Sequence, residues 1–381
     1  MRKLLTLLTF CLLLTSCKQS SGGNQAIHSN AEYADTTSMI SPSYAEGYRA
    51  RYMGSGIRLI DIQDPTKESS SAYHYALIPE GSDITNIPKG YTRIQVPVKS
   101  AVCMTSLQLS NFICLDALDR VSGITSARHL FNKEMKRRIK EGKTARIGIE
   151  GSFDNEIIMS MNPDIIFISP FKRGGYETIQ EIGIPLIPHL GYKETTPLGQ
   201  AEWIKLVAMF IGMEEEANQQ FSEIERRYNK LREIAAGAEE RPVVFSGEIR
   251  GGNWYAVGGK SFLAQLFVDA GADYFLRDDD QSGGVTLDFE TVYSLAESAD
   301  YWRIVNSFDG EYSYDALKAS DSRYADFKAF QERKVIYCNM KQKPFYESMP
   351  VEPDVVLADL IHAFHPDLLP DHQPKYYELL R

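Results

Sequence analysis

Apolar and polar positions along residues 214–236 follow the spacing of one long amphipathic helix. The apolar positions recur every four or three residues, at Ala217, Phe221, Ile224, Tyr228, Leu231 and Ala235. This spacing places a narrow apolar stripe on one side of a helix and Glu, Gln, Arg and Lys on the other sides. At about 1.5 Å per residue the helix would span roughly 35 Å. That length favours a strut between two parts of the protein, although an ordinary amphipathic surface helix is the alternative.

The two flanks of this helix repeat one pattern. Residues 152–168 read as a cap, a short helix, a turn and a buried strand, and residues 286–302 repeat that order. Glu156 lies eight residues before Asp164, whereas Glu290 lies ten residues before Asp300, so the second copy carries a two-residue insertion. The repetition predicts two half-chains of similar build with the long helix between them.

Short β-branched runs alternate with helical patterns in both halves, which predicts parallel sheets covered by helices. The expected strands are 92–98, 121–125, 146–149, 164–169 and 184–187 in the first half, and 243–245, 301–305 and 335–338 in the second. The fold class is therefore α/β, with two lobes, each a central mainly parallel sheet flanked by helices, joined by one long rigid helix. Residues 47–79 predict an additional hairpin and third strand.

The first residues have the features of a secretory signal. A positive start precedes about a dozen apolar residues and a small-residue site that ends at Cys17, which is too short for a membrane span. Six segments follow: a signal peptide (1–16), a flexible tether (17–46), a β extension (47–90), an N-terminal α/β lobe (91–213), the linking helix (214–236) and a C-terminal α/β lobe (237–381).

Composition narrows the function classes. The 381 residues carry a formal net charge of -10, which argues against a general nucleic-acid binder. Cys103, Cys114 and Cys338 are too few and too scattered for a disulfide framework or a Cys-x-x-Cys metal site, and we expect buried thiols.

Common catalytic and metal-binding motifs are missing or incomplete. The Gly-Gly-Lys-Ser ending of a phosphate-binding loop occurs at Ser261, but Trp254 occupies the position of the required first glycine. No Gly-x-Ser-x-Gly motif is present. His362 and His365 have a spacing that could share a metal, yet a structural role at a helix end is the favoured interpretation.

Two acidic and several aromatic positions are candidates for binding. Glu156 and Glu290 each fall in the first turn of a helix, which the helix dipole alone explains, but together they would form paired acidic knobs suited to arginines of a symmetric partner. Tyr192, Trp254 and Tyr255 follow expected strand ends or a glycine-rich turn, where aromatic rings stack on ligands or pack between lobes. Arg173 and Arg250 lie in comparable loops and would suit an anionic group.

The chain resembles the substrate-binding lipoproteins of bacterial ABC importers for iron-siderophores, haem and cobalamin, whose two lobes are joined by one rigid helix. The resemblance covers roughly residues 91–369, and four features of the chain carry it. They are the lipoprotein-like site at Cys17, the run Leu115-Asp-Ala-Leu-Asp-Arg-Val-Ser-Gly-Ile-Thr125, the run from Asn155 through Asn162-Pro-Asp-Ile-Ile166, and the long helix.

The resemblance implies a non-enzymatic monomer, lipid-anchored at Cys17 and facing the periplasm of the cell envelope. It would carry an iron chelate, haem or corrinoid, with no resident cofactor, to an inner-membrane ABC permease dimer and its ATPase. It also implies that Glu156 and Glu290 dock on the permease and that Tyr192, Trp254 and Tyr255 face the cleft between the lobes. A long linking helix predicts small closure. The alternatives are a carrier of bare zinc or manganese, which needs three or four converging ligands, and an envelope hydrolase.

Overall fold

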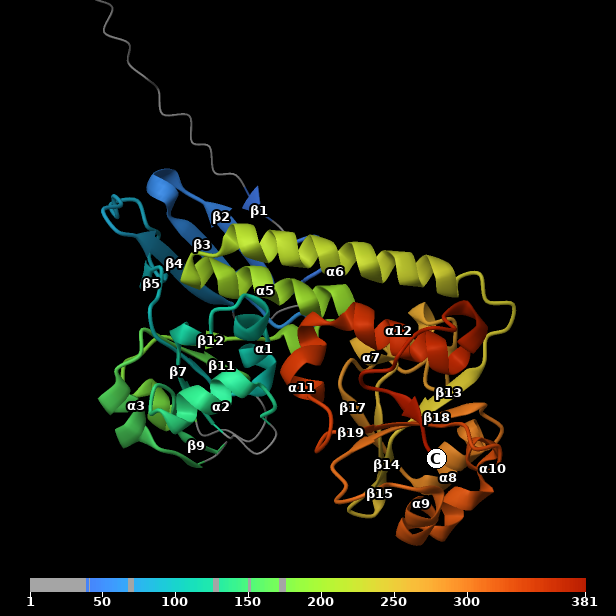
Figure 1. The fold of residues 1–381 in the computed structure, drawn as a ribbon. Helices are drawn as coiled ribbons and strands as arrows, with labels where there is room; N and C mark the ends of the chain where they lie inside the picture. The colour runs from blue at the N-terminus through green and yellow to red at the C-terminus, as the bar shows by residue number, and fades with distance from the viewer. Residues whose placement is uncertain (1–38, 41, 68–71, 126–129, 150–151, 171–175) are drawn as a thin grey trace, which may run out of the picture. The chain divides into compact units, whose positions relative to one another are not determined.

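The computed structural model describes residues 39–40, 42–67, 72–125, 130–149, 152–170 and 176–381 (Figure 1). All structural statements below concern these residues, within Thr37–Arg381, the larger of the two units into which the chain divides. The signal peptide, Cys17 and Arg173 lie outside the described residues, so the expectations for them stay expectations.

The first lobe is built on a parallel sheet with the strand order β12-β11-β6-β7-β8. Its strands are β6 (Ala101–Cys103), β7 (Val121–Ile124), β8 (Ala145–Arg146), β11 (Ile165–Ile168) and β12 (Leu186–Pro188), and an antiparallel pair adds β9 (Gly148–Ile149) and β10 (Ser152–Phe153). Its α-helices are α1 (Ser106–Cys114), α2 (Lys133–Lys140), α3 (Asn155–Met161), α4 (Glu177–Gln180) and α5 (Pro197–Ile211).

The second lobe has the strand order β16-β13-β18-β19-β20, parallel except for β20. Its strands are β13 (Val243–Ser246), β16 (Asp273–Tyr274), β18 (Tyr301–Asn306), β19 (Val335–Asn339) and β20 (Glu378–Leu379). A separate antiparallel sheet contains β14 (Glu248–Arg250), β15 (Asn253–Val257) and β17 (Gly284–Leu287). Its helices are α7 (Phe262–Asp269), α8 (Phe289–Ala296), α9 (Tyr314–Ser320), α10 (Lys328–Gln331), α11 (Phe345–Ser348) and α12 (Pro353–Phe364). The α/β fold class with two sheet-centred lobes is confirmed.

An added sheet precedes the first lobe, with the order β1-β2-β3-β4-β5. Its strands are β1 (Met39–Ile40), β2 (Tyr48–Tyr52), β3 (Arg58–Ile62), β4 (Tyr73–Pro79) and β5 (Thr92–Val96). The expectation that residues 92–98 open the sheet of the first lobe is therefore wrong, because β5 pairs in parallel with β4. Pro97 then ends the strand, since it lacks an amide hydrogen.

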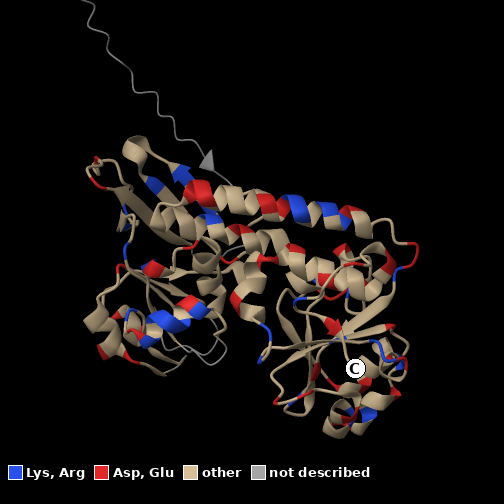
Figure 2. Ribbon diagram, in the orientation of Figure 1, with Lys and Arg blue, Asp and Glu red and all other residues tan. Residues whose placement is uncertain are grey.

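The expected long helix is observed as α6 (Glu214–Ala235), directly after α5 (Pro197–Ile211). The apolar stripe is buried except for Leu231, which is partly buried, and the other sides of α6 carry charges of both signs (Figure 2). The N-terminal part packs on α5 of the first lobe, and the rest packs on α12 of the second lobe (Figure 1). The Tyr228 hydroxyl donates to Asp269 at 2.5 Å, which ties α6 to α7. The helix therefore contacts both lobes along its length.

Two buried carboxylates attach the added sheet to the first lobe. Glu202 of α5 accepts the backbone amides of Ser43, Tyr44 and Ala45 at 2.7 to 3.0 Å. Glu194 accepts the amide of Gly47 at 3.0 Å and the indole N–H of Trp203 at 2.8 Å. Buried carboxylates are tolerated only when they are hydrogen-bonded in this way.

Candidate functional site

A cavity of about 460 Å³ is lined by residues of both lobes. The first lobe contributes Thr105, Ser106 and Leu107 at the start of α1, together with Tyr192. The second lobe contributes residues of β14, β15 and β18 and of the segment around α11, including Tyr255, Arg303, Phe345 and Tyr346. Its lining is largely apolar and aromatic, which is the usual character of a small-molecule site.

The β14–β15 hairpin decides which aromatic residue faces this cavity. Successive side chains of a strand point to opposite faces. In β15, Trp254 is 0 % exposed, whereas Tyr255 is 43 % exposed and lines the cavity. The Tyr255 ring lies across Gly284 of β17, where a Cβ atom would overlap its hydroxyl.

The expectation that Trp254 faces the cleft is therefore wrong. Its indole donates to the carbonyl of Ser246 at 2.9 Å and stacks near Trp302, with ring centroids 5.6 Å apart. Phe245 and Phe327 complete this aromatic cluster in the core of the second lobe. The side chain therefore stabilises the lobe and cannot touch a ligand in the cavity.

Tyr192 and Arg250 line the same cavity as Tyr255, as the sequence predicts. The Tyr192 hydroxyl donates to the carbonyl of Pro170 at 3.3 Å. The Arg250 guanidinium lies 5.5 Å from the centre of the Tyr255 ring and donates to the carbonyl of Val305 at 3.1 Å. Three of the five predicted ligand-binding residues are thus brought together, and their ligand-binding role stays a prediction.

Arg303 is a cavity residue that sequence reasoning missed. It is the third residue of β18, 6 % exposed, and it donates to the Tyr377 hydroxyl at 2.5 and 3.0 Å. A charged residue within the otherwise uncharged strand Tyr-Trp-Arg-Ile-Val-Asn was the available signal, since arginine is seldom fully buried without a function or a partner.

Glu156 and Glu290 occupy equivalent places in the two lobes. Each is the second residue of its helix, α3 or α8, behind an aspartate cap: Asp154 accepts the amide of Ile157 at 3.0 Å, and Asp288 accepts that of Thr291 at 2.7 Å. Both glutamates are exposed, and no hydrogen bond joins either side chain to another described residue. Both helices lie below α6 in Figure 1.

The repeated pattern extends to the strands that follow these helices. Asp164 accepts hydrogen bonds from the backbone amides of Lys99 and Ser100 at 2.6 and 3.0 Å. These two residues directly precede β6. Asp300 accepts the amide of Val243 at 2.8 Å, at the start of β13. The two-residue insertion lies between glutamate and aspartate and leaves this contact intact in both lobes.

A buried histidine directly follows β12. His189 is 3 % exposed, its ring centroid lies 4.8 Å from that of Trp203, and its Nε2 lies 3.3 Å from the Asn111 amide nitrogen. Burial lowers the pKa of His189 from 6.5 to about 4, because a charged imidazole would lose its hydration there.

We expect this histidine to make folding sensitive to acid. The unfolded chain takes up a proton near pH 6.5 and the folded chain only near pH 4, so stability falls as the pH drops through that window. Between pH 7 and 5 the loss from this residue is about 2 kcal/mol. Urea unfolding measures the free energy of unfolding at both pH values. The decrease in this free energy from pH 7 to pH 5 should be smaller by that amount in His189→Gln than in the wild type. An unchanged difference would contradict the assignment.

A larger hollow of about 830 Å³ lies between the added sheet and the second lobe. It is lined by three basic and three acidic residues, namely Arg49, Lys67, Lys260, Glu46, Asp64 and Asp280. Lys260 pairs with Asp280 at 2.5 Å, and Asp64 is paired with Lys193. Because its charges balance and partly neutralise one another, this hollow is a weaker candidate than the cavity with aromatic walls.

The described residues offer little to the rival functions. No group of three or more His, Cys, Asp or Glu side chains converges among them in a way that could hold a metal ion. His362 and His365 approach the carbonyls of Leu369 and Gly271, as expected of histidines at a helix end. The described part of the cavity wall contains serines but no histidine that could serve as their base.

The described cysteines are free thiols: Cys103 and Cys338 are buried and Cys114 is partly buried. None of the helices in the described ranges is both long enough and apolar enough to cross a bilayer.

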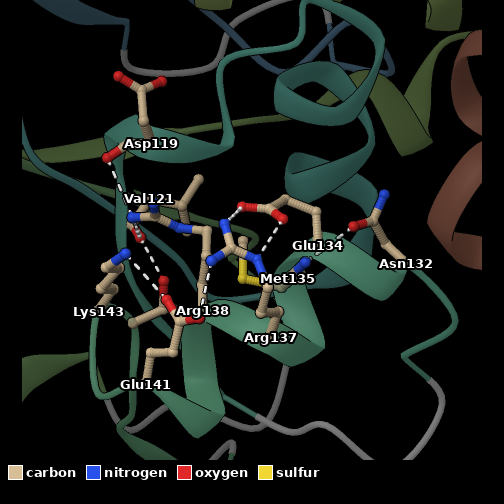
Figure 3. Close-up of polar contacts among 10 residues, drawn as sticks. Asp119, Val121, Asn132, Glu134, Met135, Arg137, Arg138, Glu141 and Lys143 are labelled. Atoms are coloured by element: carbon tan, nitrogen blue, oxygen red, sulfur yellow. Dashed lines mark hydrogen bonds and ion pairs between the residues drawn. The ribbon is translucent and has the colours of Figure 1, made fainter.

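The most basic helix, α2, uses its arginines within the first lobe (Figure 3). Arg137 pairs with Glu134 at 2.6 Å and with Glu141 at 2.7 Å, and Arg138 donates to the carbonyl of Asp119 at 3.2 Å. Both arginines are therefore engaged in contacts within the first lobe.

Comparison with known proteins identifies the kind of fold. The family model described as periplasmic binding protein matches residues 102–341, more than half of the chain. An uncharacterized lipoprotein of Methanocaldococcus jannaschii is 26% identical over 321 residues, 80% of this chain and 79% of that protein.

Two solved structures share the fold at low sequence identity. A periplasmic haem-binding protein from Pseudomonas aeruginosa matches with a TM-score of 0.60 and 15% identity, over 74% of this chain and 98% of that chain. The molybdate-binding protein MolA of Haemophilus influenzae matches with a TM-score of 0.56 and 17% identity, over 72% and 88%. Because these two proteins hold different ligands, the shared fold leaves the cargo of this chain open.

Proposed function

Since the chain belongs to the family of periplasmic binding proteins, which serve ABC-type transporters as substrate-binding components, we propose that its cargo is an iron-siderophore, haem or cobalamin-type ligand. The observation that carries this proposal is the aromatic cavity between the lobes, with Tyr192 on one side and Tyr255 on the other. Flat or ring-bearing ligands bury apolar area against such side chains, at about 25 cal/mol per Å².

The proposed role is non-enzymatic carriage. A lipid anchor at Cys17 would keep the protein at the cell envelope, and the relative named a lipoprotein supports that placement. Glu156 and Glu290 would dock on an inner-membrane permease dimer that works with its ATPase. A carrier of bare zinc or manganese is the second candidate, but the described residues converge on no ligand set for either ion.

Fluorescence titration of the purified protein tests the proposed cargo. We expect quenching of tyrosine and tryptophan emission by a member of a panel of protohaem, cyanocobalamin and several ferric chelates, with a Kd of about 1 μM or tighter. Zinc and manganese chlorides serve as the rival ligands. Saturable binding of a bare ion with no response to any chelate, haem or corrinoid would overturn the proposal.

A further inference from the structure

Arg303 is a buried cation that faces the cavity from the middle of the second lobe. It sits on β18 between Ser246 of β13 and Ile336 of β19. Its guanidinium carbon lies 5.3 Å from the ring centre of Tyr377 and 5.9 Å from that of Phe345. The strand and these two rings fix the side chain in place, and it lines the cavity wall.

Among the described residues, no carboxylate forms an ion pair with this guanidinium. Its hydrogen-bond partner is the neutral side-chain hydroxyl of Tyr377. Burial raises the pKa of Tyr377 above its ordinary value, so that hydroxyl stays neutral at physiological pH. Taking a cation out of water without a counter-ion costs several kcal/mol. Such an arrangement is typical of a site whose missing negative charge arrives with a ligand.

The rest of the cavity wall does not supply the missing charge. Its one described carboxylate, Glu248, accepts from Arg250 at 3.1 Å and from Asn306 at 3.0 Å. Arg250 and Glu248 cancel, so two arginines and one glutamate leave a formal charge of +1 on the described wall. This excess is notable in a chain whose net charge is -10.

The first lobe presents a second positive feature to the same space. The nine-residue helix α1 begins at the cavity, where Ser106 and Leu107 belong to the wall. The amides of a first helical turn and the helix dipole favour an anion there. Positive potential therefore comes from both lobes.

We infer that the cargo carries an anionic oxygen group, a carboxylate or an ionised phenolate or catecholate, which contacts Arg303 and the start of α1 when bound. This inference rests on the proposed function and narrows it. It selects anionic ferric chelates and haem, whose propionates are carboxylates, over cationic chelates and over corrinoids without net charge.

The test uses probes that differ in charge. Dissociation constants are measured for ferric enterobactin, ferric citrate and protohaem, which are anionic, and for ferrioxamine B and cyanocobalamin, which are cationic and neutral. Protohaem dimethyl ester removes only the carboxylates of haem. The test variants are Arg303→Gln and the charge-preserving Arg303→Lys. The control is Arg323→Gln, because Arg323 belongs to the same lobe but not to the cavity wall. The Arg323 guanidinium pairs with the Asp321 carboxylate at 2.7 Å.

We expect the anionic probes to contain the tightest ligand. Arg303→Gln should weaken that ligand about 10- to 100-fold, as for loss of a charged hydrogen bond. Arg303→Lys should recover most of the loss, and Arg323→Gln should bind like the wild type. If haem is the ligand, the preference of the wild type for protohaem over its ester should shrink in Arg303→Gln, which a purely structural arginine would not cause.

Two results would overturn the inference while leaving the proposed function standing. One is tightest binding of ferrioxamine B or cyanocobalamin by the wild type, a result that does not depend on any variant folding. The other is unchanged affinity of folded Arg303→Gln for an anionic ligand. Failure of every probe to bind the wild type would instead overturn the proposed function, and the inference would fall with it.

Discussion

Replacing both Glu156 and Glu290 by Ala should abolish transport and leave cargo affinity unchanged. Both side chains are exposed and neither belongs to the cavity wall, so the cavity keeps its geometry. If each glutamate enters an arginine pocket on the permease, removing one partner of a desolvated charge pair costs about 2 kcal/mol or more. Uptake of labelled cargo by reconstituted transporter, with a titration of the purified variant, measures both quantities.

A matched control comes from two other exposed glutamates, one in each lobe. Glu181 follows α4 and Glu297 follows α8, and the Glu181→Ala/Glu297→Ala variant loses the same charge. It should transport at the wild-type rate. Normal transport by the Glu156→Ala/Glu290→Ala variant, or equal loss in the control, would rule out docking by these two positions.

Alanine replacements at two adjacent residues of β15 should affect different properties, stability in one case and cargo binding in the other. Trp254→Ala removes a buried indole from the aromatic core and should lower the free energy of unfolding by about 3 to 5 kcal/mol. Tyr255→Ala should leave stability within about 1 kcal/mol and weaken cargo binding by about 1 to 3 kcal/mol, because its ring faces the cavity. Urea unfolding and cargo titration on both variants separate the two effects.

Tyr73→Ala is the control for Tyr255→Ala. Tyr73 lies on β4 of the added sheet and is 43 % exposed, the same fraction as Tyr255, but it is not part of the cavity wall. Its loss should leave cargo affinity unchanged. If Tyr255→Ala binds cargo like Tyr73→Ala, the cavity assignment of Tyr255 is contradicted.

Patterns with a strong physical period were predictable from the sequence. The apolar positions from Ala217 to Ala235 recur with the period of an α-helix, and α6 buries all of them except Leu231, which is partly buried. The sequence patterns around Glu156 and Glu290 also predict a capped helix and the strand that follows it. An aspartate before a short apolar run is a strong local signal for the start of a helix.

Features that depend on contacts far apart in the sequence were not predictable. Residues 92–96 read as a strand, but nothing local indicates that their partner is β4 rather than β6. The glycine residues near β14 indicated a turn rather than a strand. Without β14, the alternation of side chains along β15 did not show which of Trp254 and Tyr255 points into the core and which points to the cavity. Arg303 was overlooked because its significance lies in the absence of a counter-charge around it, which only the packed structure reveals.

A crystal structure of the protein with its tightest-binding cargo tests the central claim most directly. The account predicts ligand density in the 460 Å³ cavity, in contact with Tyr192 of the first lobe and Tyr255 of the second. Density confined to one lobe, or lying in the charged hollow lined by Asp64 and Lys260, would contradict it.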